Sequence, residues 1–330
     1  MMSGLSCSTS YGQAFSNNHS LAESDNKVFV VTNRIVDTTA QGTVIFTNRI
    51  DSVYGLKYLS AYKENGEWFV VKYDNLEHLL ANATPYSDWL AWVHGDGQSF
   101  LISVERALEI QRLHHVNMLV FSWPSKAPDK SPIGNFKNSR INAVRSAPYL
   151  NEFIHLFNRL KTEKESPVKF SIFFHSLANY MLESAIEQGF LDDVSPGLFE
   201  NMILNAAATD SEGHRDWVER LNFQKRLFIT SNDGDVNLAG LRAFSRFGYQ
   251  LGEKPLGTLA QNATYLDFTQ SVGFRLRTGA THSYYYSYIT RKSKNIRELF
   301  TQLLRGKEVN LSEHSRYQLL YAPNYYRVGF

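Results

Sequence analysis

The feature that most constrains the fold is an alternation, after residue 73, of short apolar runs with segments of helical periodicity. The runs are Trp89–Val93, Asn117–Phe121, Val168–Phe174, Met202–Ala207 and Arg226–Thr230. Runs that are apolar throughout are typical of parallel strands with helices on both faces of the sheet. A candidate helix follows each run, at residues 99–115, 139–163, 177–188, 214–224 and 236–245. The pattern predicts an α/β protein with a mostly parallel central sheet.

The segment before residue 73 has an antiparallel pattern instead. Two similar β-branched and aromatic runs, Val28–Ile35 and Thr43–Ile50, each end in Thr-Asn-Arg-Ile. Two further candidate strands, Leu56–Tyr62 and Glu67–Tyr73, are joined at Asn65-Gly66, a dipeptide typical of tight hairpins. We therefore expect antiparallel strands at the N-terminal end of the sheet.

The domain organisation is predicted to be simple. Residues 1–26 are rich in Ser and Asn and are expected to form a flexible tail. No repeat or linker divides the rest, so residues 27–330 are predicted to form one domain. Stretches that contain Gly and Pro at residues 122–138, 189–198 and 247–262 are expected to be lid-like loops.

Composition excludes several classes of protein and leaves the oligomeric state open. The net charge is +2 and the basic residues are scattered, so we expect no nucleic-acid partner. The single cysteine, Cys7, cannot form an intrachain disulfide. No stretch approaches the roughly 18 apolar residues of a membrane span, and residues 1–26 lack the pattern of a signal peptide. A cytoplasmic location is therefore expected.

A candidate nucleophile lies where one predicted strand meets the next helix. The segment His175–Asn179 reads His-Ser-Leu-Ala-Asn. A serine on such a turn matches a nucleophile elbow, in which the turn exposes the hydroxyl and the helix start offers N–H groups to an oxyanion. The usual pattern has glycine two positions before and after the serine, where this chain has Phe174 and Ala178. We expect Ser176 to be the nucleophile; the alternative is that it only caps the helix.

A second loop has the features of an oxyanion hole. The segment His94–Ser99 follows the run Trp89–Val93 and begins with His-Gly, as the loop that donates the second oxyanion N–H group does. We expect the hole to consist of the N–H groups of Leu177 and of Asp96 or Gly97. The Gly-x-Gly spacing also occurs in dinucleotide-binding loops, but the third glycine of that motif is absent here.

A nucleophilic serine needs a base, and the base needs a carboxylate to orient it. His282 lies late in the chain and is expected to be the base. Asp233 and Asp235 follow one predicted strand, and Asp210 follows the strand before it. A turn at Asp233 would face the elbow, so we expect Asp233 to orient His282, with Asp235 and Asp210 as alternatives. The order Ser, Asp, His along the chain is that of the α/β-hydrolases.

The other histidines are expected to be structural. His175 adjoins the nucleophile but should point back from the turn, which favours a packing role. His114 and His115 lie at a predicted helix end, where a positive charge suits the helix dipole, and are expected on the surface. No set of His, Cys and carboxylate residues has zinc-site spacing, so no metal site is expected.

Five short motifs together point to a family. They are Val28–Arg34 with its final Thr-Asn-Arg, His94-Gly95, Phe121–Ser125 (F-S-W-P-S), His175–Asn179 and Ser231–Asp233. In this order they resemble a bacterial α/β-hydrolase family of unknown function, over roughly residues 28 to 290. The resemblance implies the α/β-hydrolase fold and marks Ser176, Asp233 and His282 as a triad. This chain departs from the family at the elbow, with Phe where the family has Ala and Ala where it has Gly.

These residues predict a serine hydrolase that acts on a small-molecule acyl ester, as an esterase or lipase does, without a metal or organic cofactor. His94, Trp123, Tyr284 and Tyr285 are expected to line the substrate pocket. Amide hydrolysis uses the same groups and stays an alternative. A non-catalytic binding protein on a degenerate hydrolase fold is the second alternative, which the bulky Phe174 favours.

Overall fold

The computed structural model describes residues 13–17, 27–81, 88–163, 169–245, 248–274 and 279–329. Its strands are β1 (Gln13–Asn17), β2 (Lys27–Thr32), β3 (Arg34–Thr38), β4 (Thr43–Ile50), β5 (Lys57–Glu64), β6 (Glu67–Tyr73), β7 (Asp88–Val93), β8 (Asn117–Ser122), β9 (Lys169–His175), β10 (Phe199–Asn205), β11 (Gln224–Ser231), β12 (Ala263–Asp267), β13 (Tyr317–Leu319) and β14 (Tyr325–Val328). Its helices are α1 (Leu76–Ala81), α2 (Phe100–His114), α3 (Pro132–Glu163), α4 (Ala178–Glu187), α5 (His214–Val218), α6 (Val236–Ser245), α7 (Tyr288–Lys292) and α8 (Lys294–Leu304).

All described strands belong to one sheet, in the order β13-β14-β12-β11-β10-β9-β7-β8-β2-β5-β6-β1-β4-β3. Eight consecutive neighbours, from β14 to β2, pair in parallel. Every predicted apolar run overlaps one of these strands. The strands are apolar throughout because helices cover both faces of the parallel sheet. The predicted mostly parallel sheet is confirmed.

The N-terminal strands add an antiparallel extension to this sheet. Strand β5 pairs antiparallel with both β2 and β6, and Asn65 and Gly66 have the positive φ angles (50° and 89°) of a two-residue hairpin turn. The predicted strand Val28–Ile35 is divided, however: β2 ends at Thr32 and β3 begins at Arg34. This break lets β2 join the parallel strand β8 while β3 pairs with β4 at the edge.

The predicted flexible tail is wrong in one place. Residues 13–17 form β1, which pairs with β4 and β6, and Phe15 is 2% exposed. Its ring packs edge-on against Phe46 and Phe100, and this apolar contact holds the strand on the sheet. The rest of the tail, including Cys7, lies outside the described residues.

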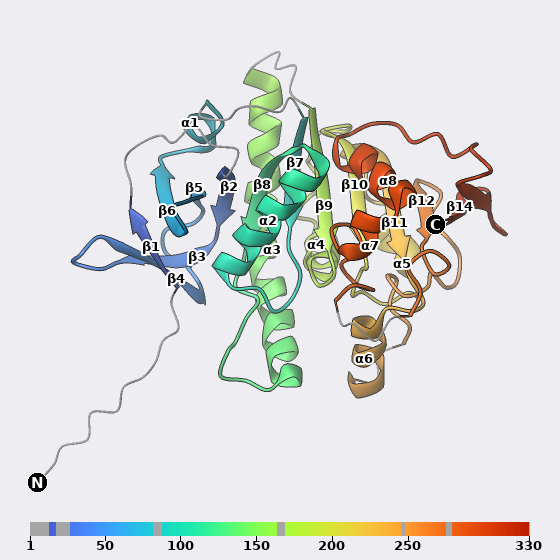
Figure 1. Cartoon of the computed structure of the whole chain (residues 1–330), viewed down its shortest axis with the longest axis horizontal. Helices are drawn as coiled ribbons and strands as arrows, with labels where there is room; N and C mark the ends of the chain where they lie inside the picture. Colours follow the sequence, from blue (N-terminus) through green and yellow to red (C-terminus); the bar gives the residue numbers. More distant parts are fainter. Residues whose placement is uncertain are drawn as a thin grey trace, which may run out of the picture.

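Helices cover the parallel strands on both faces (Figure 1). Helices α2, α7 and α8 lie in front of the sheet in this view, and the long α3 lies behind it. The same division appears in the core: one buried cluster joins the sheet to α3, α4 and α5, and another joins it to α2, α7 and α8. Alternate residues of a strand serve the two clusters; Phe174 belongs to the first and Phe173 to the second.

The predicted loops agree with the structure in part. The segment 122–138 is not all loop, since α3 begins at Pro132, which fixes a helical φ at the first position. Residues 189–198 and the described residues 248–262 contain no helix or named strand. Strands β12 to β14 and helices α7 and α8, in the C-terminal part, were not predicted.

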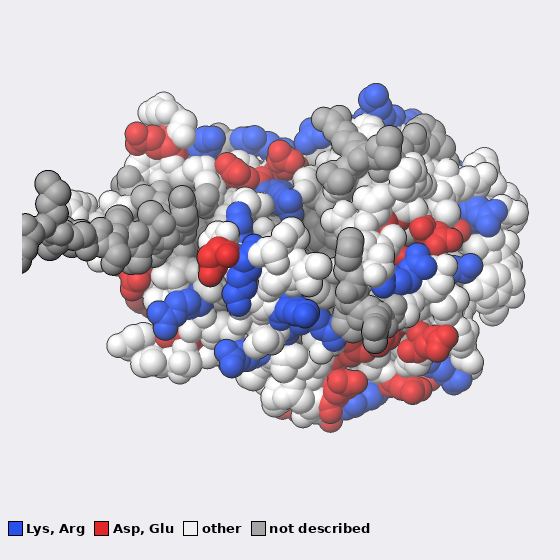
Figure 2. Space-filling model, turned by 90° about the horizontal axis from the view of Figure 1, so that it is seen from below, with Lys and Arg blue, Asp and Glu red and all other residues white. Residues whose placement is uncertain are grey.

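Two surface properties concern binding partners. Among the described residues, no helix is both long enough and apolar enough to cross a membrane. On the face shown in Figure 2, basic and acidic side chains are interspersed.

Candidate active site

Ser176 lies on a tight turn between the end of β9 and the start of α4. Its φ of +55° is in the left-handed region, which costs a non-glycine residue about 1–3 kcal/mol. Hydrogen bonds hold the turn from both sides: the Ser176 N–H donates to the Asn205 carbonyl (2.9 Å), and the Ser176 carbonyl accepts from the N–H groups of Asn179 (3.1 Å) and Ala208 (3.2 Å). The backbone around Ser176 thus has the geometry of a nucleophile elbow.

The bulky Phe174 fits this turn because its side chain belongs to the core. The ring is fully buried in the cluster between the sheet and helices α3 and α4. The side-chain amide of Asn179 donates to the Phe174 carbonyl (3.2 Å) and to the Ser176 carbonyl (3.0 Å), and so ties the first helical turn to the strand end. Phe174 therefore leaves the turn intact.

The predicted oxyanion loop closely approaches this turn. A Cβ atom on Gly95 would lie 2.8 Å from the Ser176 Cβ and 3.0 Å from the His175 carbonyl oxygen, so only glycine fits there. In the described part of the chain, neither the Leu177 N–H nor the Asp96 N–H has a hydrogen-bond partner. Both are therefore free to donate to an oxyanion.

Gly97, the alternative donor, does not suit this role. Its N–H donates to the Ser125 carbonyl at 2.8 Å. The loop turns back toward the F-S-W-P-S segment at Gly97, whose φ is +71°, and this bond closes the turn. The prediction that the Gly97 N–H donates to the oxyanion is wrong, because this N–H already donates to the Ser125 carbonyl.

His282 is held by Asp235. The Nδ1 atom of His282 lies 2.6 Å from Oδ2 of Asp235, and the two side chains are 8% and 0% exposed. The other carboxylate oxygen accepts the N–H groups of Asn237 (3.0 Å) and Leu238 (3.2 Å) at the start of α6. Both oxygens are therefore fixed, one by the helix and one by the imidazole.

The prediction that Asp233 orients His282 is wrong. The Asp235 N–H donates to the Asn232 carbonyl (3.0 Å), which closes a turn with Asp233 at its outer tip. Asp233 is exposed, and its N–H donates to the Thr269 hydroxyl. Asp235 comes two residues later, where the chain has turned inward. Asp210 is exposed too and forms an isolated bridge with Gln250.

The His282 imidazole lies close to the elbow. Its ring centroid is 4.7 Å from that of His175, the residue before Ser176. In the described residues, Ser176 and His282 share no hydrogen bond, so the expected hydroxyl–imidazole contact stays a prediction. Such contacts are often longer without a bound ligand.

His175 is kept neutral beside His282. Burial is the main cause that lowers its pKa well below the usual value, and the nearby His282 acts in the same direction. Its Nδ1 bonds to the side-chain oxygen of Asn205 at 2.9 Å, and its ring packs against Tyr285. The predicted packing role of His175 agrees with these contacts.

The four residues expected to line the substrate pocket are buried. The His94 and Trp123 rings are stacked with centroids 5.6 Å apart; the Trp123 indole N–H donates to the His94 carbonyl (2.7 Å), and the Trp123 backbone N–H to the His94 ring (3.2 Å). Tyr284 places its hydroxyl 2.9 Å from that of Thr230, and Tyr285 packs on Phe173. None of the four lines the cavity beside His282, and their place in a substrate pocket stays a prediction.

Comparison with protein families gives one match. Residues 75–241, about half of the 330 residues, match the family described as "Alpha/beta hydrolase of unknown function (DUF900)". The chain belongs to this family of α/β hydrolases. The family resemblance and the predicted fold are thereby confirmed. The match includes Ser176 and Asp235, whereas His282 lies beyond it. A comparison with curated proteins found no match.

The Thr-Asn-Arg motif of this α/β hydrolase has a structural role at the site. Arg34 is fully buried, and its guanidinium donates to the carbonyls of Gln98 (3.0 Å) and Trp123. It also donates to the Ser122 hydroxyl (3.2 Å) and the Asn48 side chain (2.9 Å). Burial lowers the Arg34 pKa to about 9, so the side chain stays charged at neutral pH. Arg34 thus ties the oxyanion loop to the N-terminal strands.

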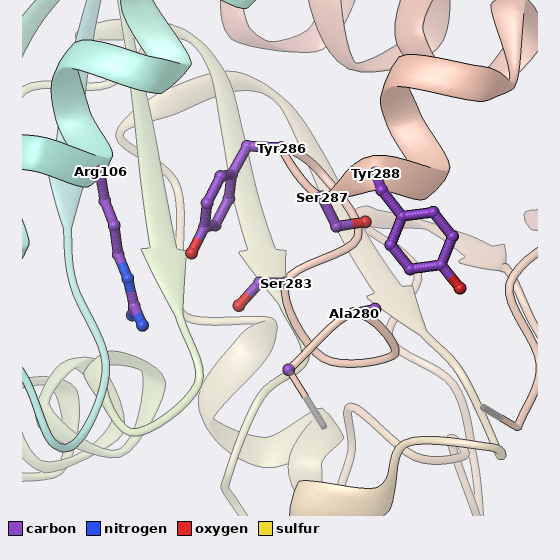
Figure 3. A pocket seen from close by; sticks show the side chains of 7 residues that line it. Arg106, Ala280, Ser283, Tyr286, Ser287 and Tyr288 are labelled. Carbon is purple, nitrogen blue, oxygen red and sulfur yellow. The ribbon is translucent and has the colours of Figure 1, made fainter. Parts of the chain in front are cut away.

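The structure has a cavity next to His282 that the sequence patterns did not predict. It has a volume of about 360 Å³ and is lined by Arg106, Gly279, Ala280, Ser283, Tyr286, Ser287 and Tyr288 (Figure 3). One signal was present in the sequence: Ser283 and Tyr286 lie within four residues of the predicted base. Arg106 could not be placed there, because its position depends on how α2 packs against the loop 279–287.

The carboxyl group of Asp96 is unusual for the oxyanion loop. Burial raises its pKa above the usual range, and its carboxylate accepts a hydrogen bond from the side-chain amide of Asn135 (2.9 Å). The bond to Asn135, at the start of α3, fixes the side chain of Asp96. Its backbone N–H stays unpaired in the described structure.

Proposed function

We propose that this α/β hydrolase is a serine esterase, with Ser176 as nucleophile, His282 as base and Asp235 as the orienting acid. The observation that carries the proposal is the buried Asp235–His282 pair (2.6 Å) beside a serine with a φ of +55°. A strained serine at a strand-to-helix turn and a carboxylate-oriented histidine are what nucleophilic acyl transfer requires.

The first half of the reaction forms an acyl-enzyme. Ser176 Oγ attacks the ester carbonyl carbon while His282 Nε2 takes the hydroxyl proton. The N–H groups of Leu177 and Asp96 donate to the oxyanion of the tetrahedral intermediate. As the intermediate collapses, the bond to the leaving alkoxide breaks, and His282 gives its proton to that oxygen.

The second half regenerates the enzyme. A water molecule attacks the acyl carbon, and His282 takes one of its protons. The Ser176 oxygen leaves, recovers that proton from His282, and the carboxylic acid is released. Throughout, Asp235 keeps the Nδ1–H tautomer of His282 and stabilises the imidazolium. None of these steps needs a metal or an organic cofactor.

Active-site labelling tests the proposal. A fluorophosphonate probe reacts with an activated serine, so folded wild-type protein should be labelled at Ser176, as located by peptide mass spectrometry. Ser176→Ala and heat-denatured wild-type protein are the controls and should stay unlabelled. Folded protein that the probe does not label would instead favour the non-catalytic binding protein.

Turnover separates ester from amide hydrolysis. We expect hydrolysis of ethyl butyrate, followed by proton release, and much slower cleavage of butyramide, whose amine is a poorer leaving group. Faster cleavage of the amide would favour the amidase alternative. In both cases Ser176→Ala should lose activity, because the same nucleophile serves both reactions.

A further inference from the structure

The cavity beside His282 contains a cation with no partner. Arg106 lies in the middle of α2 and is half-buried. Among the described residues it makes no hydrogen bond or ion pair. A half-buried guanidinium has five donors, and it is best satisfied by a planar anion. The cavity therefore has an unmatched positive charge.

Hydroxyl groups surround this charge. Ser283 and Tyr286, from the loop before α7, line the same cavity as Arg106. Figure 3 shows the Tyr286 ring and the Ser283 side chain on the side of the loop that faces Arg106. Gly279 and Ala280 form part of the wall, and their small size leaves the space open. These hydroxyls can donate to an anion that Arg106 binds.

Among the described residues, no carboxylate lines the cavity. The nearest acidic influence that the described residues show is that of Glu109, whose charge adds slightly to the raised pKa of Tyr286. Glu109, one turn further along α2, is half exposed and lies 3.9 Å from Arg291. Glu105 is exposed on the same helix. The charge of Arg106 is thus available to a ligand.

The cavity is next to the reacting groups. Ser283 directly follows His282, and its hydroxyl oxygen lies 3.5 Å from His175 Nε2. His175 in turn precedes Ser176, so Ser283 is close to the elbow. Burial lowers the pKa of His175 and raises that of Tyr286; the positive charge of Arg106 adds to the first change and opposes the second, so its influence reaches both residues. Ser283 thus connects the cavity to the residues on either side of the proposed reaction centre.

We propose that this cavity binds a carboxylate of the substrate, so that the esterase acts on half-esters of dicarboxylic acids. Arg106 binds the carboxylate through two parallel N–H donors, and Ser283 and Tyr286 donate to its remaining lone pairs. One cation matches the single charge of a carboxylate, and a volume of about 360 Å³ suits a small acyl chain. The proposal rests on the esterase function and adds a substrate class to it.

Two nearly isosteric esters test the preference. Monoethyl glutarate carries the carboxylate, and ethyl 5-oxohexanoate has a methyl ketone in its place; hydrolysis of both is followed by proton release. Wild type should prefer the glutarate ester in kcat/KM. Arg106→Gln should lower kcat/KM for that ester by about 10- to 100-fold, the usual effect of a charge-assisted hydrogen bond. The neutral ester should change less than about 3-fold, since its methyl ketone makes no ion pair with Arg106.

A matched control removes the same charge from the same helix. Arg112 is exposed near the end of α2 and does not line the cavity. Arg112→Gln should keep the wild-type ratio of the two kcat/KM values. An equal preference for both esters in wild type, or the same loss in both variants, would overturn the proposed carboxylate site.

Binding separates this proposal from the proposed reaction. Glutarate is titrated calorimetrically into Ser176→Ala protein, with and without Arg106→Gln, after circular dichroism has shown that both are folded. Binding that depends on Arg106 supports the carboxylate site even if no ester is hydrolysed. Hydrolysis of the neutral ester without any glutarate binding would refute the carboxylate site and leave the esterase function intact.

Discussion

The exchange Asp235→Asn provides the sharpest test of the His282 geometry, because the structure fixes how the new amide must point. One carboxylate oxygen accepts two N–H groups at the start of α6, and the other faces His282 Nδ1. An asparagine at this position has to keep its oxygen toward the helix, since an NH₂ group cannot accept those bonds. Its NH₂ group then faces the imidazole.

This orientation selects the wrong tautomer of His282. Nδ1 has to accept from the NH₂ group, so the proton moves to Nε2, which can no longer take the proton of Ser176. In a comparable triad the same exchange lowers kcat by about 10⁴, or roughly 5.5 kcal/mol of transition-state stabilisation. The free energy of unfolding should fall by only about 1 kcal/mol, because the helix keeps its cap and loses a charge.

The assay compares Asp235→Asn with Asp233→Asn by ethyl butyrate hydrolysis and by urea denaturation. Asp233 is exposed at the tip of the same turn, so its exchange should leave kcat within about 3-fold of wild type. Asp235→Asn protein that keeps a tenth of the wild-type kcat would refute the tautomer argument. A large loss in Asp233→Asn alone would restore Asp233 as the orienting acid.

Two further predictions concern stability. Phe174→Ala should lower the free energy of unfolding by roughly 3–5 kcal/mol, measured with urea, because it empties a fully buried site, while the elbow of the folded fraction still reacts with the fluorophosphonate. For His114, burial lowers the pKa to about 4, so the unfolded chain binds a proton below about pH 6.5 that the folded protein does not bind until near pH 4. The neutral form of His114 therefore stabilises the folded protein fully above about pH 6.5, and this stabilisation is lost as the pH falls from about 6.5 to about 4. In that range His114→Gln should reduce the slope of the unfolding free energy against pH by up to about 1.4 kcal/mol per pH unit. An unchanged slope would contradict the buried neutral state of His114.

The parts of the molecule that were predicted well are those with local patterns. The apolar runs coincide with β7 to β11, and Ser99, the first residue of the predicted helix 99–115, caps α2, with its hydroxyl accepting from the Ile102 N–H. The turn at Ser176 could be located because a strand pattern meets a helix pattern there. Such signals depend on neighbours in sequence, so no knowledge of the tertiary structure was needed.

The errors at the site have a different cause. Asp233 and Asp235 differ by two positions in one turn, and which of them points inward depends on the close contact between Gly234 and the backbone of Gly273. His114 was expected on the surface, yet it is buried between α2 and α8, where its ring bonds to the Thr301 hydroxyl (2.8 Å) and the Tyr285 carbonyl (2.8 Å). Only His115, the αL residue that ends α2, is exposed as predicted. These placements depend on contacts far apart in the chain.

The position of Arg34 outside the family match has a consequence for how this chain can be divided. The family match begins at residue 75 and ends at residue 241, so it contains Ser176 and Asp235, the proposed nucleophile and orienting acid, but neither Arg34 nor His282. The matched segment alone would lack both the proposed base and the cation that donates to the carbonyls of Gln98 and Trp123. We therefore expect residues 75–241 alone to have no hydrolase activity. Gene fusions or truncations that keep only residues 75–241 would contain the proposed nucleophile without His282 and Arg34.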